Sequence, residues 1–176
     1  KNLKPQSWQG DQVLLKLFEK LGVQTNFTKE GLYIHKNICN KNKFTFDLLQ
    51  YPDITQAICC ALSGLKKSAT IYGLQTLKIK ETDRLKALKK ELIKFSVMTK
   101  IDQESIQIDS LNFNTPNQSL SSHNDHRMAM SLAPLSIVTK KITITNANVV
   151  TKSYPNFWKE LKKLGFIITF STHSNN

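Results

Sequence analysis

Two stretches of this sequence superimpose at a constant offset of 72 residues, and this internal repeat constrains the fold more than any other feature. The matching positions pair Asp53 with Asp125, Ile71 with Thr143, Lys80 with Lys152, and Leu92 with Leu164. Because a repeated sequence ordinarily encodes a repeated supersecondary unit, the architecture is expected to follow from the content of one copy.

Each copy contains a short strand, a small apolar helix, a second strand and a second amphipathic helix. The apolar positions of the first helix are Ile54, Ala57, Ile58, Ala61 and Leu62 in one copy and Met128, Ala129, Leu132 and Leu135 in the other. The second strand is predicted over 68–72 and 140–144. The second helix places Leu85, Leu88, Leu92 and Phe95, or Phe157, Leu161 and Leu164, on one face. Strands over 97–101 and 105–108 then complete the middle copy as a hairpin.

The beginning of the sequence matches only the second half of such a unit, with a helix over 11–21 and a hairpin over 23–27 and 32–35. We therefore predict an α/β (α+β) fold of about two and a half β-α-β-α-β-β units, divided at 1–36, 37–109 and 110–173. On this interpretation the chain begins inside a domain. The most loop-like connections are 36–43 and 112–118.

The formal charge of +12 suggests an anionic partner, and nucleic acid, an anionic membrane and anionic metabolites are the three classes to weigh. Of the 25 basic residues, only Arg84 and Arg127 are arginines. A guanidinium can hold a carboxylate or phosphate through two parallel hydrogen bonds, whereas an ammonium cannot. These two arginines are therefore candidate anion clamps.

The apolar runs, such as 57–62, are too short to cross a bilayer, and no signal-peptide pattern opens the sequence, so we expect no membrane segment. Cys39, Cys59 and Cys60 lack the spacing of a zinc site or a redox pair. We expect them to be reduced and buried in a cytoplasmic protein, with no metal bound.

The repeat places charged residues at equivalent strand-to-helix junctions. Lys80 and Lys152 precede the second helix of each copy, and Asp53 and Asp125 precede the first. Free N–H groups at helix starts already favour anions, so these junctions predict a cationic cluster with embedded carboxylates.

Each residue also has a simpler interpretation. Asp53 and Asp125 could be helix caps, and Glu81 and Asp83 could complement a helix dipole. His126 and Arg127 could be ordinary surface residues. The coincidence of both arginines, both lysines and both aspartates at these junctions favours a binding site.

Three ordered motifs carry a resemblance that extends from about Gln9 to Phe166. Lys80-Glu81-Thr82-Asp83-Arg84 resembles the Lys-Glu-(Ser/Thr)-Asp-Arg signature of 5-enolpyruvylshikimate-3-phosphate (EPSP) synthases. The second and third signatures are matched by Asp125-His126-Arg127-Met128-Ala129 and by Lys152-Ser153-Tyr154-Pro155. The resemblance implies an inside-out α/β barrel, in which each of two lobes has three units. This chain would be part of the C-terminal lobe, with the N-terminal lobe absent.

Such enzymes transfer the enolpyruvyl group of phosphoenolpyruvate to the 5-hydroxyl of shikimate-3-phosphate and release phosphate without a cofactor. The resemblance assigns phosphoenolpyruvate to Arg84, Arg127 and Lys152, and shikimate-3-phosphate to Asp53, Thr76 and Lys80. It makes Asp53 the base for the hydroxyl, Glu81 the group that moves protons at the methylene, and His126 an aid to orientation or proton traffic. Thr76 replaces a common Asn and Lys78 replaces an Arg, which leaves the Thr76 contact open.

Three alternatives remain. A transferase acting on UDP-N-acetylglucosamine shares the fold and the donor but lacks the Lys-Glu-Thr-Asp-Arg run. A nucleic-acid-binding module would use the positive charge, although the sequence has no basic stripe interleaved with aromatic residues. An inactive scaffold lobe is disfavoured by the intact Asp53, Glu81 and Arg127. We expect the chain alone to be inactive, because only one wall of the site is present.

Overall fold

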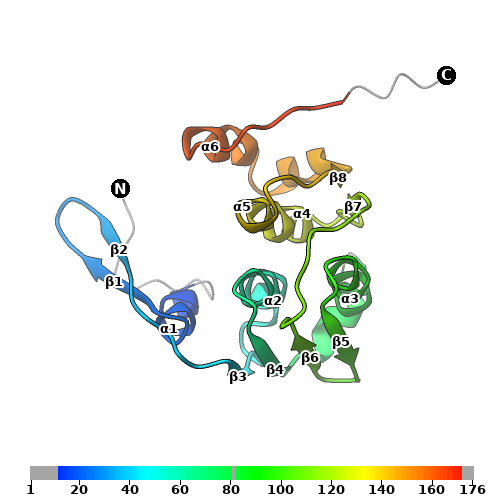
Figure 1. Cartoon of the computed structure of the whole chain (residues 1–176), viewed down its shortest axis with the longest axis horizontal. Coiled ribbons are helices and arrows are strands. Elements are labelled where there is room, and N and C mark those ends of the chain that lie inside the picture. The colour runs from blue at the N-terminus through cyan, green and yellow to red at the C-terminus, as the bar shows by residue number, and fades with distance from the viewer. Residues whose placement is uncertain (1–11, 81, 172–176) are drawn as a thin grey trace.

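The computed structural model describes residues 12–80 and 82–171 (Figure 1). The segment predicted as the complete middle unit of the repeat contains a four-stranded mixed sheet. Its strands lie in the order β3-β4-β6-β5, where β3 is Lys43–Asp47, β4 is Ser68–Tyr72, β5 is Met98–Ile101 and β6 is Ile106–Asp109. Strands β3 and β4 run parallel, and the other two pairings are antiparallel. The predicted strands over 68–72, 97–101 and 105–108 are confirmed to within a residue.

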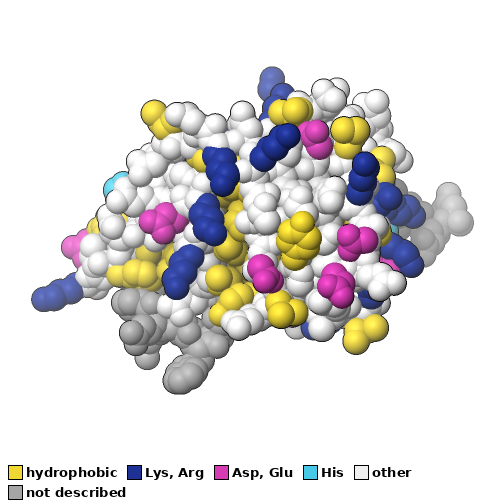
Figure 2. Space-filling view, turned by 90° about the horizontal axis from the view of Figure 1, so that it is seen from below, with side chains coloured by type: hydrophobic (Ala, Val, Ile, Leu, Met, Phe, Trp, Pro, Cys, Tyr) yellow, Lys and Arg dark blue, Asp and Glu magenta, His cyan; other side chains and the backbone are white. Residues whose placement is uncertain are grey.

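Helices α2 (Thr55–Gly64) and α3 (Arg84–Lys94) cover one face of this sheet (Figure 1). The burial of β3 alternates as period-two side chains require, with Phe44 and Phe46 turned toward the helices. The view from below in Figure 2 shows basic side chains interspersed with acidic and apolar ones.

The last unit contains a smaller, parallel two-stranded sheet of β7 (Leu120–Ser121) and β8 (Ile144–Thr145). Its helical elements are α4 (His126–Leu132), η4 (Ala133–Leu135), α5 (Ser136–Thr139), η5 (Ala147–Lys152) and α6 (Phe157–Lys163). The strand predicted over 140–144 was too long, because Lys140 adopts φ 65° and residues 141–143 are irregular. The α-helix also stops before Leu135, since Pro134 lacks the N–H that would continue it.

The segment predicted as a half-unit contains α1 (Val13–Glu19), followed by the antiparallel hairpin of β1 (Val23–Phe27) and β2 (Leu32–Lys36). The predicted helix and hairpin are thus confirmed, although Asp11 lies outside the described residues. Among the described residues, no helix is long and apolar enough to span a bilayer.

The repeat is visible in three dimensions beyond what the sequence suggested. The equivalent helices α2 and α4 pack against each other, and one continuous core joins the middle and last units. Where the sequence predicted simple turns, the structure has two 3₁₀ helices, η3 (Gln75–Ile79) and η5, which begin 72 residues apart. Lys80 directly follows the first and Lys152 is the last residue of the second, so the two lysines stand at the ends of equivalent 3₁₀ helices.

Two sequence-based interpretations need correction. Asp53 is not the N-cap of α2, because it lies within the 3₁₀ turn η2 (Pro52–Ile54), and the N-cap, Ile54, makes no side-chain cap bond.

The cysteines are free as expected, and Cys59 and Cys60 are buried, but Cys39 is partly exposed. Burial raises the pKa of the Cys60 thiol to about 12.

Candidate active site

A buried arginine joins the two repeat-equivalent aspartates. Arg84, at the start of α3, is only 2% exposed, and its Nε atom donates to Asp125 Oδ2 over 2.6 Å while Nη1 donates to Asp53 Oδ1 over 2.7 Å. A planar guanidinium is suited to bridging two carboxylates in this way. The helix starts of the middle and last units are therefore tied together by charge-assisted hydrogen bonds.

The two carboxylates differ in exposure. The Asp125 side chain is fully buried, accepts a bond of 2.8 Å from the Arg127 N–H as the N-cap of α4, and accepts another of 3.1 Å from Gln56 Nε2. The side chain of Asp53 is 37% exposed and lies 3.4 Å from Lys80 Nζ. Asp53 is consequently the carboxylate of this pair that an incoming ligand can reach.

Arg127 and Lys152 extend the cluster from the last unit. Arg127 Nη1 donates to the backbone carbonyl of Asp53 over 3.3 Å, and Lys152 Nζ donates to the carbonyl of Asn124 over 3.5 Å. Arg127 is partly buried, whereas Lys152 is exposed. The cationic side chains predicted from separate motifs thus gather around the Asp53–Asp125 junctions.

The other predicted residues are placed as follows. His126 is the first residue of α4, and its buried Nδ1 atom has no hydrogen-bond partner among the described residues. Thr76 lies exposed on η3. Glu81 lies outside the described residues. Over 12–80 and 82–171, no group of three His, Cys, Asp or Glu side chains is arranged to hold a metal ion.

Sequence reasoning did not single out Gln56, which is 1% exposed on α2 and donates to Asp125. Its buried Oε1 atom has no hydrogen-bond partner within the part of the chain that the structure describes. The available signal was a polar amide within an otherwise apolar helix face, where burial of an amide is unfavourable unless it is hydrogen-bonded.

Asp83, the residue before Arg84, is the N-cap of α3 and not merely a charge near the helix dipole. Its Oδ1 atom accepts from the Lys86 N–H over 3.1 Å. Partial burial raises the pKa of Asp83, but hydrogen bonds from Lys86 and the positive charges of Lys86 and Lys78 outweigh it, so the pKa is lowered. This cap fixes the first turn of α3, which carries Arg84 into the cluster.

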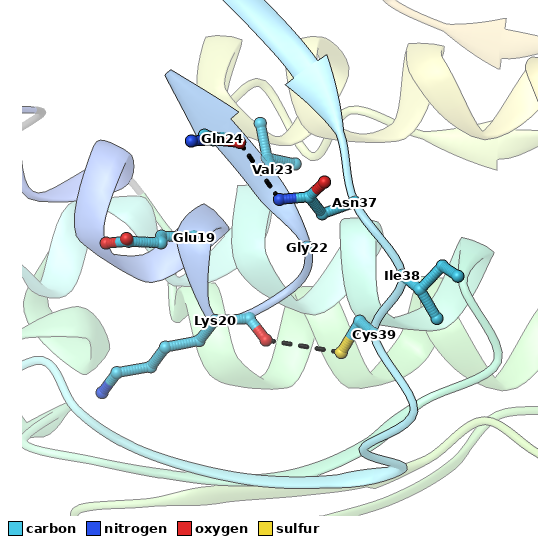
Figure 3. Close-up of a pocket in the computed structure, with 8 residues that line it drawn as sticks. All are labelled: Glu19, Lys20, Gly22, Val23, Gln24, Asn37, Ile38 and Cys39. Carbon is cyan, nitrogen blue, oxygen red and sulfur yellow. Dashed lines mark hydrogen bonds between the residues drawn. The ribbon is translucent and has the colours of Figure 1, made fainter. Parts of the chain in front are cut away.

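The cavity of about 280 Å³ in Figure 3 lies elsewhere, between the end of α1, the start of β1 and residues 37–39. Asn37 Nδ2 donates to Gln24 Oε1 across it, and the Cys39 thiol donates to the Lys20 carbonyl. Of the candidate residues that the structure describes, none lines this cavity. A second hollow of about 340 Å³ lies beside Asp83 and Lys78, near the start of α3.

The family model described as EPSP synthase (3-phosphoshikimate 1-carboxyvinyltransferase) matches residues 1–161. The chain belongs to the EPSP synthase family. Among curated relatives, the 3-phosphoshikimate 1-carboxyvinyltransferase of Bacteroides fragilis is 38% identical over 91% of this chain, and that of Clostridium novyi is 34% identical over 92%. The chain spans about 40% of the length of the former and 37% of the latter.

Solved structures agree on the fold of this EPSP synthase family chain. An EPSP synthase from Acinetobacter baumannii aligns with a TM-score of 0.68 at 19% identity, covering 85% of this chain and 38% of the other. The enolpyruvyl transferase NikO from Streptomyces tendae aligns with a TM-score of 0.56 at 16% identity, covering 85% and 34%. The predicted fold class and the family resemblance are therefore confirmed.

Proposed function

We propose that this chain forms the C-terminal wall of a cytoplasmic enzyme that transfers the enolpyruvyl group from phosphoenolpyruvate to the 5-hydroxyl of shikimate-3-phosphate. The observation that carries the proposal is the pair of unequal carboxylates joined by Arg84. Asp125 is buried and bonded on both oxygens, whereas Asp53 is partly exposed beside Lys80. A base must reach its proton, so Asp53 is the one suited to accept it from a substrate hydroxyl.

Both substrates are anionic, and the cluster offers the charge to hold them together. Lys80, Arg84, Arg127 and Lys152 outnumber Asp53 and Asp125 among the described residues of the site. We assign phosphoenolpyruvate to Arg84, Arg127 and Lys152, and shikimate-3-phosphate to Asp53, Lys80 and Thr76. Concentrating cations offsets the repulsion between the substrates and brings the reacting atoms together.

The reaction proceeds by addition and elimination. The 5-hydroxyl oxygen forms a bond to C2 of phosphoenolpyruvate as Asp53 takes its proton, and the C3 methylene receives a proton from Glu81. Glu81 then removes a proton from C3, the C2–C3 double bond re-forms, and the bond from C2 to the phosphate oxygen breaks. Phosphate leaves with the proton that Asp53 accepted, which restores the Asp53 carboxylate, and no external oxidant, reductant or cofactor is consumed. We assign His126 to orienting these groups.

The test is complementation of the absent lobe. This chain alone is expected to release no phosphate from phosphoenolpyruvate, because the other wall of the site is missing. Adding the amino-terminal portion of the Bacteroides fragilis relative should produce phosphate release that depends on shikimate-3-phosphate. Release with UDP-N-acetylglucosamine in its place would contradict the proposed acceptor, and turnover by the chain alone would contradict the role as one wall.

A titration with a random oligonucleotide tests the remaining alternative, a nucleic-acid-binding module. Binding that weakens steeply as salt is raised would favour a nucleic-acid partner, since phosphate contacts release counterions. Figure 2 shows acidic and apolar side chains among the basic ones on that face, which favours the metabolite proposal instead.

A further inference from the structure

The side chain of Glu91, on the inner face of α3, is completely buried, yet it has no part in the chemistry proposed above. Its Oε2 atom lies 2.7 Å from Lys94 Nζ and accepts from the Ser121 N–H over 2.9 Å, while Oε1 lies 2.7 Å from His123 Nε2. A carboxylate oxygen only accepts, so Nε2 carries a proton in this arrangement. A buried carboxylate is tolerated only when it is paired and hydrogen-bonded, and here both oxygens are.

Glu91 and Lys94 together clamp the strand that leads into the site. Lys94 Nζ donates to the carbonyl of Ser119 over 2.9 Å, immediately before β7, and Glu91 accepts from the N–H of Ser121, the last residue of β7. The bond to His123 then extends the clamp into the following turn. An ion pair of α3 thus holds the backbone on both sides of Leu120.

The clamped turn has an unfavourable backbone. His123 and Asn124 adopt φ values of 52° and 57°, in the left-handed region that non-glycine residues seldom occupy. Such residues persist only when the surrounding structure holds them there. Local bonds contribute, since Ser121 Oγ accepts from the His123 N–H over 3.0 Å, and the Asp125 N–H donates to the Ser122 carbonyl over 2.9 Å. The Glu91–His123 bond adds an anchor from outside the turn.

The turn ends at the residues that the proposed function needs. Asn124 supplies the carbonyl that holds Lys152, and Asp125 caps α4 and pairs with Arg84. We propose that Glu91, acting through His123, is a positioning residue that fixes this turn and so sets the place of Lys152 in the phosphoenolpyruvate site. This inference rests on the proposed function for its kinetic consequence.

The middle unit shows why the last unit needs this anchor. At the offset of 72, Tyr51 and Pro52 stand opposite His123 and Asn124. The proline ring holds φ near −65°, so the Asp53 junction is restrained by covalent geometry. The Asp125 junction has no proline, and its left-handed turn is held by side chains instead.

The kinetic test uses the complete enzyme with Glu91→Gln, since a neutral amide cannot accept from three donors. We expect KM for phosphoenolpyruvate to rise about tenfold, because a small misplacement of Lys152 weakens its contact, while KM for shikimate-3-phosphate stays within about twofold. His123→Ala should raise KM for phosphoenolpyruvate by a similar factor. His123→Gln keeps a side-chain donor, so its KM should stay close to that of the unaltered enzyme. Glu160→Gln removes an exposed pair with Lys163 of the same spacing and serves as the control.

The structural test uses this chain alone and does not depend on catalysis. In long-range ¹H–¹⁵N spectra, Glu91→Gln should shift the ring nitrogens of His123, and exchange of the Ser121 amide should quicken about tenfold, because its acceptor is weakened. Glu160→Gln should leave both unchanged. If the unaltered complete enzyme releases no phosphate in response to shikimate-3-phosphate, the proposed function fails. The spectra then still test whether Glu91 anchors His123. Unaltered His123 signals in Glu91→Gln, or equal losses for both substrates, would overturn the inference.

Discussion

The Asp53 and Asp125 junctions occupy equivalent places in the repeat and yet have opposite local structures. Asp53 follows Pro52 inside a 3₁₀ turn and keeps its side chain 37% exposed, whereas Asp125 follows two left-handed residues, caps α4 and is fully buried. A proline cannot take a positive φ, so the two approaches to the helix had to diverge. The residues before the two aspartates thus differ together with the exposure of the carboxylates.

Arg84 links the buried carboxylate to the exposed one, because its guanidinium donates to both and is itself almost wholly buried. The buried partner, Asp125, balances the guanidinium charge inside the protein, where an unpaired charge would be costly. The exposed partner, Asp53, is held in place without being removed from solvent. The comparison predicts that Asp53 serves the reaction and Asp125 serves the structure.

The largest expected effect is that of Asp53→Asn on turnover in the complete enzyme. An amide cannot take the hydroxyl proton, and loss of a positioned base typically lowers the rate on the order of 100- to 10,000-fold. Unfolding free energy should fall by only about 1 kcal/mol, since the amide oxygen can still accept from Arg84. Steady-state rates and urea unfolding measure the two quantities.

Asp109→Asn is the matched control for this substitution. Asp109 accepts from Ser68 at the start of β4, so it lies at the opposite end of that strand from Lys80, and it should retain full turnover. Near-normal turnover in Asp53→Asn would contradict the assignment of Asp53 to the reaction and leave the base unidentified.

The second effect is on stability, in Asp125→Ala. This change removes the cap of α4 and leaves Arg84 buried beside a missing partner, which should lower the unfolding free energy by about 3–5 kcal/mol. Asp125→Asn keeps an acceptor for the cap and should cost less, about 1–3 kcal/mol, with a smaller loss of turnover than Asp53→Asn. Urea unfolding of this chain measures the stabilities. A loss below about 1 kcal/mol in Asp125→Ala would show that the buried pair is dispensable.

The sequence was sufficient to predict the fold class, the family and most of the helices and strands. Periodicity located α2, α3 and the β5–β6 hairpin, because each buries one face against a shared core. The 72-residue offset also brought Lys80 and Lys152 into equivalent positions, which the matching 3₁₀ helices η3 and η5 explain. These features are local or repeated, so one copy supports the interpretation of the other.

What sequence patterns could not show are contacts between units. The roles of Gln56 and Glu91 depend on residues that come later in the chain, since Gln56 donates to the Asp125 side chain and Glu91 accepts from the Ser121 N–H. The prediction that Asp53 caps α2 was wrong for a different reason. In a sequence, an aspartate before an apolar helix looks the same whether or not it caps that helix. Pro52 was the available signal, because it favours a turn before the helix begins.

The third effect separates the two arginines. In the complete enzyme, Arg127→Lys and Arg84→Lys should each raise KM for phosphoenolpyruvate about tenfold and change that for shikimate-3-phosphate far less, because a fork of donors is replaced by a point charge. Only Arg84→Lys should also destabilise the protein, by about 2 kcal/mol, since it bridges Asp53 and Asp125. Equal losses for both substrates would contradict the assignment of these arginines.

The smallest effect is that of Asp83→Ala on stability. Asp83 caps a helix without pairing with a buried arginine, so its loss gives the free energy that a cap alone contributes. Asp83→Ala should cost about 1 kcal/mol, so the excess cost of Asp125→Ala reports the pair with Arg84. Because the pKa of Asp83 is lowered from 3.8 on folding, its ionised form adds stability above that value and loses it as the pH falls further. Asp83→Asn keeps the cap but lacks this titration, so its unfolding free energy should fall less steeply below about pH 4. Urea unfolding from pH 5 to about pH 2 compares the slopes, and identical slopes would mean that the lowered pKa of Asp83 adds nothing to acid sensitivity.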